Sequence, residues 1–406
     1  MELKTGYKQT EVGVIPSDWK FNTLGGIFQF KQGVQCSVEK QHFQDGKGLK
    51  RFVRIIDLTQ PSESPRYILD PSPAHHINVN DLFMVRYGSP GLLGFGYEGV
   101  IANNLFRLIP KTKMSNVYFY HLLSYKNQDI LQLSSSTTMA ALNFTALREL
   151  KITYPSTIIE QTSIATALSD TDQYITHLEK LIAKKRNIKQ GAMQELLRAK
   201  EGWVVNTYGE VFDFLTTATY SRADLSDTGE IGYVHYGDIH TKWSSFLDFK
   251  KYKLPTIGKN QLKNYPLLRE GDIIMADASE DYSGVGESIE VKNLGENKSI
   301  SGLHTFLLRD KKGVFVNGFK GYIHKSKIVK SQIEKLASGL KVYGISKYNL
   351  KAVQIPIPPI EEQTRIATIL SDMDSEITTL ETKLAKAQSI KQGMMQQLLT
   401  GKIRLI

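Results

Sequence analysis

Residues 160–197 read EQTSIATALSDTDQYITHLEKLIAKKRNIKQGAMQELL, and residues 362–399 read EQTRIATILSDMDSEITTLETKLAKAQSIKQGMMQQLL. The second stretch follows the first at a constant offset of 202 residues without a gap, and 24 of the 38 positions are identical. A solenoid needs at least about three stacked repeats to bury a continuous core, so two copies do not predict one. The chain is therefore predicted to be a duplicated module with a long helix at the end of each half.

Both copies have the apolar spacing of a coiled-coil helix. Their apolar residues step by four and three positions, which is the seam along which two helices pair. The predicted seam residues are Ile164, Leu168, Ile175, Leu178 and Ile182 in the first copy and Ile366, Leu370, Met373, Ile377, Leu380 and Leu384 in the second. Lys185 breaks the apolar seam of the first copy. The alternative interpretation is that each helix packs only on its own globular half.

Prolines mark the start of both helices, with Pro155 before the first and Pro358 and Pro359 before the second. Glu and Gln then occupy the first turn, as is typical of helix N-termini. At about 1.5 Å per residue, roughly 36 residues make a rod on the order of 54 Å long.

Composition limits the class of protein. At 406 residues, of which 41% are hydrophobic, the chain has room for two or three domains with sizeable cores. The N-terminal residues lack an apolar signal region and no apolar run approaches 18 residues, so we expect a cytoplasmic protein without a membrane segment. The single cysteine, Cys36, excludes an internal disulfide. His75 and His76 are predicted to be a surface pair, so we expect no metal site.

A formal net charge of +10 favours a polyanionic partner such as nucleic acid. Residues 1–159 carry 17 basic and 12 acidic side chains, which is the largest excess of any segment. Charge by itself leaves a mildly basic protein without a nucleic acid partner as an open alternative.

The segments between the helices also echo one another, as short strand-like stretches separated by Gly, Asn and Ser turns. The echoes pair Trp19 with Trp203, residues 52–58 with residues 233–239, Asp81 with Asp272, and the stretch from Leu142 with the stretch from Ile345. The loops between these matched stretches differ in length and chemistry. Divergent loops on a shared frame predict two related binding surfaces with different targets.

These features together resemble the specificity subunit of type I restriction-modification systems. The resemblance lies in the motif EQxxIAxxLSDxDxxIxxLE, present twice and each time followed by IKQGxMQxLL, and in the opening GVIPSDW and the closing LLTGKIRLI. It implies an α+β fold with two mixed α/β target-recognition domains, joined by two long helices in an antiparallel coiled coil, with pseudo-two-fold symmetry. The implied domains are residues 1–155 and 201–357 for target recognition, and residues 156–200 and 358–406 for the repeat helices.

The resemblance also implies the function and the partners. Each recognition domain is expected to bind one half of a split double-stranded DNA target, while the helices set the spacer. Two methyltransferase subunits are expected to dock on this chain, with restriction subunits bound through them. The cofactors S-adenosylmethionine, ATP and Mg²⁺ are expected in those partner subunits, and none in this chain.

Base readout needs polar side chains on turns, and phosphate contacts need basic groups, hydroxyls and exposed amides. Six loop stretches have this chemistry, three in each half. The predicted DNA-contacting residues are Lys47, Lys50, Arg51, Arg86, Tyr87, Ser89, Tyr97, Thr137 and Thr138 in the first half and Thr219, Tyr220, Arg222, Ser279, Tyr282, Ser283, Lys341, Tyr343 and Lys347 in the second. For each residue taken singly, a solvated loop position is the alternative.

The sequence contains no GxxxxGK[ST] phosphate loop, and the chain is therefore predicted not to hydrolyse nucleotides. Asp277 followed by Glu290 and Lys292 imitates the acidic and basic residues of a metal-dependent nuclease. The alternative function is accordingly a self-sufficient nuclease or methyltransferase with its site in the second half. A third possibility is a coiled-coil adaptor that makes no DNA contact.

Overall fold

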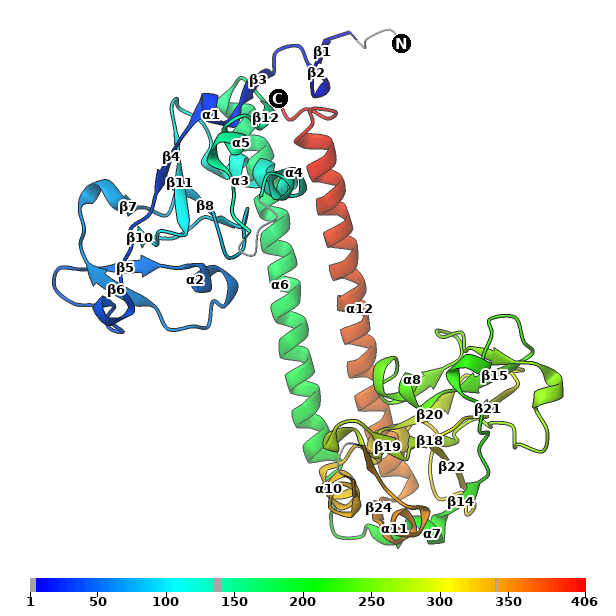
Figure 1. Cartoon of the computed structure of the whole chain (residues 1–406). Helices are drawn as coiled ribbons and strands as arrows, with labels where there is room; N and C mark the ends of the chain where they lie inside the picture. Colours follow the sequence, from blue (N-terminus) through cyan, green and yellow to red (C-terminus); the bar gives the residue numbers. More distant parts are fainter. Residues whose placement is uncertain (1–4, 135–139, 340–341) are drawn as a thin grey trace. The chain divides into compact units, whose positions relative to one another are not determined.

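The computed structural model describes residues 5–134, 140–339 and 342–406 (Figure 1). The chain divides into two compact units. Unit 1 comprises Met1–Glu179 and Thr382–Ile406, and unit 2 comprises Lys180–Glu381. Each unit therefore combines one β-rich body with a segment of each of the two long helices, α6 (Ile158–Leu196) and α12 (Ile360–Leu398).

The body of unit 1 consists of short strands and short helices. Its strands are β1 (Tyr7–Thr10), β2 (Gly13–Pro16), β3 (Lys20–Thr23), β4 (Phe28–Gln32), β5 (Leu49–Val53), β6 (Arg66–Leu69), β7 (His76–Ile77), β8 (Leu82–Val85), β9 (Leu93–Gly94), β10 (Gly99–Ile101), β11 (Leu105–Pro110) and β12 (Lys151–Tyr154). Its helices are α1 (Leu24–Ile27), α2 (Ile55–Thr59), α3 (Asn116–Tyr125), α4 (Asn127–Gln132) and α5 (Phe144–Arg148). The strands form sheets in the orders β4-β11-β8-β9, β6-β5-β10-β7, β12-β3 and β1-β2.

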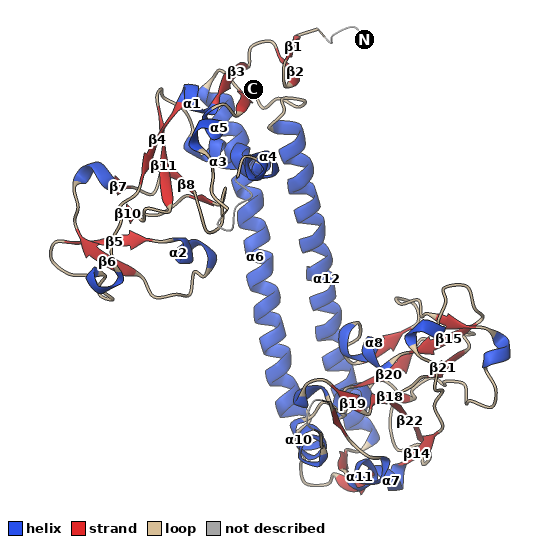
Figure 2. Ribbon diagram, in the orientation of Figure 1, coloured by secondary structure: helices blue, strands red, loops and turns tan. Residues whose placement is uncertain are grey.

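The body of unit 2 has the same kind of architecture (Figure 2). Its strands are β13 (Val204–Thr207), β14 (Phe212–Leu215), β15 (Ile231–Val234), β16 (Phe246–Asp248), β17 (Thr256–Ile257), β18 (Ile273–Ala276), β19 (Ala278–Ser279), β20 (Ser288–Lys292), β21 (Ser299–Ser301), β22 (Thr305–Asp310), β23 (Tyr343–Gly344) and β24 (Gln354–Ile357). Its helices are α7 (Tyr208–Val211), α8 (Tyr236–Thr241), α9 (Lys320–Ile323), α10 (Lys327–Leu336) and α11 (Lys347–Ala352). The sheet orders are β14-β22-β18-β20-β16, β17-β15-β21, β13-β24 and β19-β23.

The two bodies share their central topology, which confirms the predicted duplication. The antiparallel order β4-β11-β8 of unit 1 recurs as β14-β22-β18 in unit 2, and the parallel pair β5–β10 recurs as β15–β21. The pair β3–β12 recurs as β13–β24. The sheet edges differ, since β7 lies beside β10 in unit 1 and β16 lies beside β20 in unit 2.

Each body buries the first turns of its own long helix. Ile164 and Leu168 of α6 are fully buried in the core of unit 1, beside Trp19. Ile366 and Leu370 of α12 are buried in the same way in the core of unit 2. At these positions the apolar seam serves the globular core as well as the helix pair, so packing on the helix's own half and helix pairing both occur.

A buried glutamine fixes the start of each long helix. The side chain of Gln161 donates to the carbonyl of Pro155 at 2.9 Å and accepts from the backbone N–H of Ser115 at 2.9 Å. Gln363 donates to the carbonyl of Pro358 at 2.9 Å and accepts from the N–H of Val316 at 2.8 Å. Buried polar groups are costly unless they are hydrogen-bonded, so these contacts fix the angle at which each helix leaves its body.

The long helices pair antiparallel within each unit, as the fold class predicted. In unit 1, Asp172 of α6 forms an ion pair with Lys391 of α12 at 2.5 Å, and Glu160 contacts Arg404, beyond the end of α12, at 2.5 Å. Residue numbers therefore rise along α6 as they fall along α12. In unit 2, the corresponding pairs are Lys185–Glu376 at 2.6 Å, Arg186–Glu381 at 2.6 Å, Lys189–Asp374, and Lys200–Glu362 at 2.9 Å.

The predicted seam residues differ in burial along the helices. The buried ones are Ile164, Leu168, Leu178, Ile182, Ile366, Leu370 and Ile377, and the half-buried ones are Ile175, Met373, Leu380 and Leu384. Beyond Ile182 the seam of α6 becomes polar, because Lys185 and Lys189 take the next positions and pair with acidic residues of α12. The helix continues past Lys185 without interruption.

Candidate DNA interface

The first predicted cluster lies around β5 of unit 1. Lys47 and Lys50 are exposed, and the guanidinium of Arg51 lies 3.7 Å from the carboxylate of Asp57 and 5.7 Å from the ring centroid of Tyr97. The hydroxyl of Tyr97 donates to the Asp57 carbonyl at 3.0 Å. Arg51 and Tyr97 therefore form one cluster, in which Tyr97 supports the arginine and the lysines remain free to meet a phosphate.

The second predicted cluster follows β8. The guanidinium of Arg86 lies 4.4 Å from the ring centroid of Phe144, and Tyr87 forms a β-bridge with Ala141. The hydroxyl of Ser89 donates to the carbonyl of Gly88, whose φ of 95° is a conformation that favours glycine. Arg86 is half-buried and lies over an aromatic ring directly after β8. The predicted contacts Thr137 and Thr138 lie outside the described residues.

In unit 2, the predicted contact Arg222 is held by a buried carboxylate. Its guanidinium donates to both carboxylate oxygens of Asp238, at 2.9 and 3.1 Å, and Lys242 lies 3.0 Å from the same group. Burial raises the pKa of Asp238, but hydrogen bonds from these two cations outweigh it and lower the pKa below its usual value. Half of the Arg222 side chain stays exposed. Arg222 is therefore preorganised and still accessible.

The two predicted contacts that precede Arg222 in the sequence differ in exposure and in hydrogen bonding. Thr219 is exposed, whereas the hydroxyl of Tyr220 donates to the carbonyl of Gln261 at 2.8 Å and Lys263 lies over its ring. Arg222 also lines a groove of about 360 Å³ with Lys242 and Lys253, two lysines that the sequence analysis did not select.

The last predicted cluster joins β19 to β23. Ser279 is buried and accepts a hydrogen bond from Asp281, and it pairs with Tyr343 in the sheet. The ring of Tyr282 packs edge-on against Tyr343, and its hydroxyl donates to the carbonyl of Glu334 at 2.5 Å. Tyr282 and Tyr343 thus form a surface pair that rests on Ser279.

The remaining predicted contacts of unit 2 are Lys347, Lys341 and Ser283. The ammonium of Lys347 donates to the carbonyl of Phe214 at 3.3 Å and lies over that ring. Lys341 lies outside the described residues, and the side chain of Ser283 is not described.

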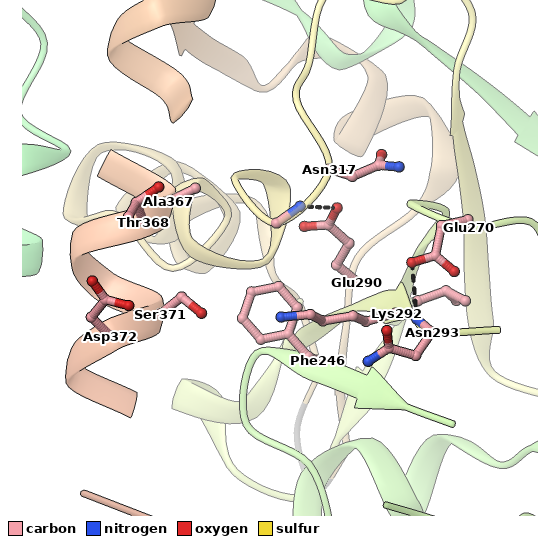
Figure 3. Close-up of a pocket in the computed structure, with 12 residues that line it drawn as sticks. Phe246, Glu270, Glu290, Lys292, Asn293, Asn317, Ala367, Thr368, Ser371 and Asp372 are labelled. Carbon is pink, nitrogen blue, oxygen red and sulfur yellow. Dashed lines mark hydrogen bonds between the residues drawn. The ribbon is translucent and has the colours of Figure 1, made fainter. Parts of the chain in front are cut away.

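Glu290 and Lys292 line a cavity of about 320 Å³ in unit 2 (Figure 3). Asp277 is not among the lining residues, and its carboxylate lies 3.3 Å from Nδ1 of His304. The carboxylate of Glu290 accepts from the backbone N–H groups of Gly318 and Gly321, both at 2.7 Å, and lies 3.5 Å from the ammonium of Lys320. Burial raises the pKa of Glu290, and Lys320 opposes the shift. Lys292 lies over the ring of Phe246. The carboxylate of Glu290 is therefore already bound by groups of the chain itself.

Within residues 5–134, 140–339 and 342–406, no group of three His, Cys, Asp or Glu side chains is placed to hold a metal ion. In the same ranges, no helix is both long and apolar enough to cross a membrane.

A duplicated junction ties each body to both long helices. In unit 1, Asp172 lies 2.5 Å from Lys391 and 3.9 Å from Nδ1 of His121, and Nε2 of His121 lies 3.0 Å from the Ser169 hydroxyl. Burial lowers the pKa of His121 to about 4, so this imidazole is neutral at pH 7.

In unit 2 the equivalent carboxylate is Asp374, 202 residues later. It contacts Lys189 and accepts a hydrogen bond from the hydroxyl of Tyr322 at 2.7 Å. The two junctions share the Asp–Lys pair and differ in the side chain supplied by the body. The same Asp and Lys occur at equivalent positions of both repeats, and this repetition is the sequence signal that could have located the junctions.

The chain matches known proteins along almost its whole length. A family model described as "Type I restriction modification DNA specificity domain" matches residues 16–190 and again residues 200–391. The type I restriction enzyme MjaVIII specificity subunit of Methanocaldococcus jannaschii is 24% identical over 96% of this chain and 94% of its own length. The putative type I restriction enzyme MjaX specificity subunit of the same organism is 26% identical over 98% of this chain and 97% of its own length.

Solved structures share the fold. The S subunit of a type I restriction-modification system from M. genitalium superposes with a TM-score of 0.59 at 16% identity, covering 98% of both chains. A chain from a structural study of complex assembly and conformational transition in the type I R-M system has a TM-score of 0.58 at 16% identity, covering 96% of this chain and 99% of that one.

Proposed function

Because the chain belongs to the family defined by the type I restriction modification DNA specificity domain, we propose that it is the sequence-specific DNA-binding subunit of a type I restriction-modification complex. Each unit reads one half of a bipartite double-stranded target. The observation that carries this proposal is the duplication itself, in which one strand topology recurs twice with different loop chemistry. Two different readers in one chain suit an asymmetric target, whereas a homodimer suits a palindrome.

The long helices act as the spacer between the half-sites. Both α6 and α12 are continuous over 39 residues, and each contributes a segment to both units. A paired helical rod fixes distance and rotation, which a flexible linker does not. A bipartite duplex target requires both, because each base pair adds rise and turn.

DNA contact is assigned to the exposed and preorganised side chains of the two bodies. In unit 1 these are Lys47, Lys50 and Arg51, and in unit 2 they include Arg222. The lysines suit phosphate oxygens, which position the protein without reading sequence. A guanidinium suits guanine in the major groove. Half of the Arg222 side chain stays exposed, although both of its terminal nitrogens donate to Asp238, and Arg86 of unit 1 is half-buried.

The chain itself is non-catalytic in this proposal. Two methyltransferase subunits dock on it and carry S-adenosylmethionine, and restriction subunits bound through them carry ATP and Mg²⁺. The occupation of Glu290 by Lys320 and by backbone N–H groups supports this assignment, because a catalytic carboxylate must be open to a metal or substrate.

The direct test compares the chain alone with the chain and its partner subunits. The purified chain, incubated with duplex DNA, Mg²⁺ and S-adenosylmethionine, is expected to bind DNA but neither to cleave nor to methylate it. Genome-wide methylation mapping with the partners present is expected to show one bipartite sequence with an unspecified gap. Methylation or cleavage by the chain alone would contradict the proposal and favour a hidden active site.

A further inference from the structure

The segment that connects α2 to β8 in unit 1 and its counterpart that connects α8 to β18 in unit 2 have net charges of opposite sign. In unit 1, residues 60–80 connect α2 to β8 and carry one basic and two acidic side chains, for a net charge of −1. In unit 2, residues 242–271 connect α8 to β18 and carry seven basic and two acidic side chains, for a net charge of +5. This segment of the shared frame is therefore strongly cationic in unit 2 and slightly acidic in unit 1.

Much of this charge lies on one short turn, residues 248–253, here called the lysine turn. The carboxylate of Asp248 accepts from the backbone N–H of Lys250 at 3.0 Å, and its carbonyl accepts from the N–H of Lys251 at 2.9 Å and of Tyr252 at 3.0 Å. The Asp248 carboxylate also accepts from the side chain of Asn293 at 2.8 Å. The backbone beneath the lysines is thus fixed by hydrogen bonds.

Packing on either side holds the turn in place. The ring of Tyr252 meets the ring of Trp243 edge-on, with 6.2 Å between the centroids, and Leu254 is buried. The backbone of a turn anchored in this way has little conformational entropy left to lose when its side chains bind a ligand.

The ammonium groups of the turn are not neutralised within the chain. Lys250, Lys251 and Lys253 are exposed, and no described carboxylate lies within ion-pair distance of them. Lys242 differs, because it is paired with the buried Asp238. The three free charges are therefore available to an external anion.

The lysine turn continues into the groove of about 360 Å³ that contains Arg222. Lys253 lines this groove together with Lys242 and Arg222, and Asp227 is the acidic residue of its lining. A cationic turn thus borders a preorganised arginine on the same face of unit 2. This arrangement suits an extended polyanion better than a single small anion.

We propose that the lysine turn binds the DNA backbone phosphates next to the half-site read by unit 2. The proposal rests on the proposed function and adds to it a set of lysine–phosphate contacts, at a segment whose counterpart in unit 1 is acidic. Lysine is a point charge without a fixed donor fork, so these contacts position the duplex and carry no sequence information. Duplex DNA offers one phosphate charge per about 1.7 Å of axis, which places several phosphates within reach of one turn.

The salt dependence of binding tests the proposal. The full chain, in complex with its partner subunits, is titrated with a random-sequence duplex at several salt concentrations. In the variant K250Q/K251Q/K253Q the log-log slope is expected to fall by about 2.7, at about 0.9 per lost phosphate contact. Raising the salt from about 50 to about 200 mM then weakens the wild type about forty-fold more than the variant.

A matched control removes the same charge elsewhere in unit 2. Lys312, Lys327 and Lys335 are also exposed and lack a described ion-pair partner, so K312Q/K327Q/K335Q is expected to keep the wild-type slope. The charge-conserving variant K250R/K251R/K253R is expected to keep it as well. An unchanged slope in the glutamine variant, or an equal loss in the control, overturns the assignment of phosphate contacts to the lysine turn.

The sequence preference separates this proposal from the proposed function. The glutamine variant is expected to methylate the same bipartite sequence as the wild type, at reduced affinity. A changed half-site would mean that these lysines read bases, which also overturns the proposal. Absence of salt-dependent duplex binding by the wild type would overturn the proposed function itself.

Discussion

Removing the carboxylate of Asp374 is expected to destabilise unit 2. Two donors would lose their acceptor, the hydroxyl of Tyr322 at 2.7 Å and the ammonium of Lys189. Hydrogen bonds to a charged group contribute about 1.5–3 kcal/mol each. Because 36% of the Asp374 side chain is exposed, solvent screening reduces the combined loss, and we expect about 2 kcal/mol for Asp374→Ala. In a unit of this size, that lowers Tm by roughly 4–8 °C.

The equivalent change in unit 1 is expected to cost less. Asp172 has one close partner, Lys391, while Nδ1 of His121 lies 3.9 Å away, beyond hydrogen-bonding distance. We expect Asp172→Ala to cost about 1 kcal/mol or less. Asp170 lies two residues earlier on α6 and is exposed, so Asp170→Ala is the matched control and should change stability by less than about 0.5 kcal/mol.

Urea unfolding combined with hydrogen exchange of each unit measures these losses separately. A double-mutant cycle between Asp374→Ala and Tyr322→Phe should give a coupling free energy of about 1 kcal/mol. If Asp374→Ala costs no more than Asp170→Ala, or if the cycle shows no coupling, the junction does not hold the body of unit 2 on the helices.

Three further outcomes follow from the fold. Inserting four residues after residue 179 of α6 and four after residue 381 of α12 adds about 6 Å to each helix and should widen the unspecified gap in the DNA target by one or two base pairs. If methylation mapping shows the original gap, the helices do not set it. Exchanging residues 1–150 for those of a relative should alter one half-site only, and a change in both would contradict independent reading. The pKa of His121 is about 4 in the folded state and about 6.5 in the unfolded state. Between these pH values the unfolded state binds one more proton, so the free energy of unfolding should fall by up to about 3 kcal/mol as pH drops from 6.5 to 4. In His121→Tyr, which copies Tyr322 of unit 2, denaturant melts across that pH range should lose this dependence, and an unchanged profile would assign it to other groups.

The long helices could be predicted from sequence because their signal is local. Heptad spacing and flanking prolines lie within each repeat, and the helices begin at Ile158 and Ile360, directly after Ser156-Thr157 and Pro359. The positions of Lys185 and Lys189 could not be interpreted in the same way. In the sequence, a lysine interrupts the apolar heptad pattern. The structure shows that these two lysines form ion pairs, because Glu376 and Asp374 lie opposite them on α12.

The candidate contacts could be selected by residue type but not sorted by role. Both Ser279 and Arg222 belong to polar stretches of the sequence, yet Ser279 is buried in β19 and Arg222 is held by Asp238 with half its side chain exposed. The lysines from Lys250 to Lys253 are visible in the sequence, but basic runs are common on solvated surfaces, so the run by itself does not indicate a binding role. Its fixed backbone depends on Asn293, which is distant in sequence.

The sequence by itself determined that the chain is a duplication, that each half ends in a long helix, and that the protein belongs with DNA-binding restriction subunits. The duplication and the helices follow from repetition and periodicity, and the family follows from the resemblance of the repeated motif to a known family; none of the three needs knowledge of distant contacts. Only the tertiary structure decided which cationic side chains are paired within the chain and which are not, since Arg222 and Lys242 both contact the carboxylate of Asp238 while no described carboxylate lies within ion-pair distance of Lys250 and Lys251. The physical reason is that ion pairing and burial join residues far apart in the chain, and a linear pattern holds no record of which residues meet.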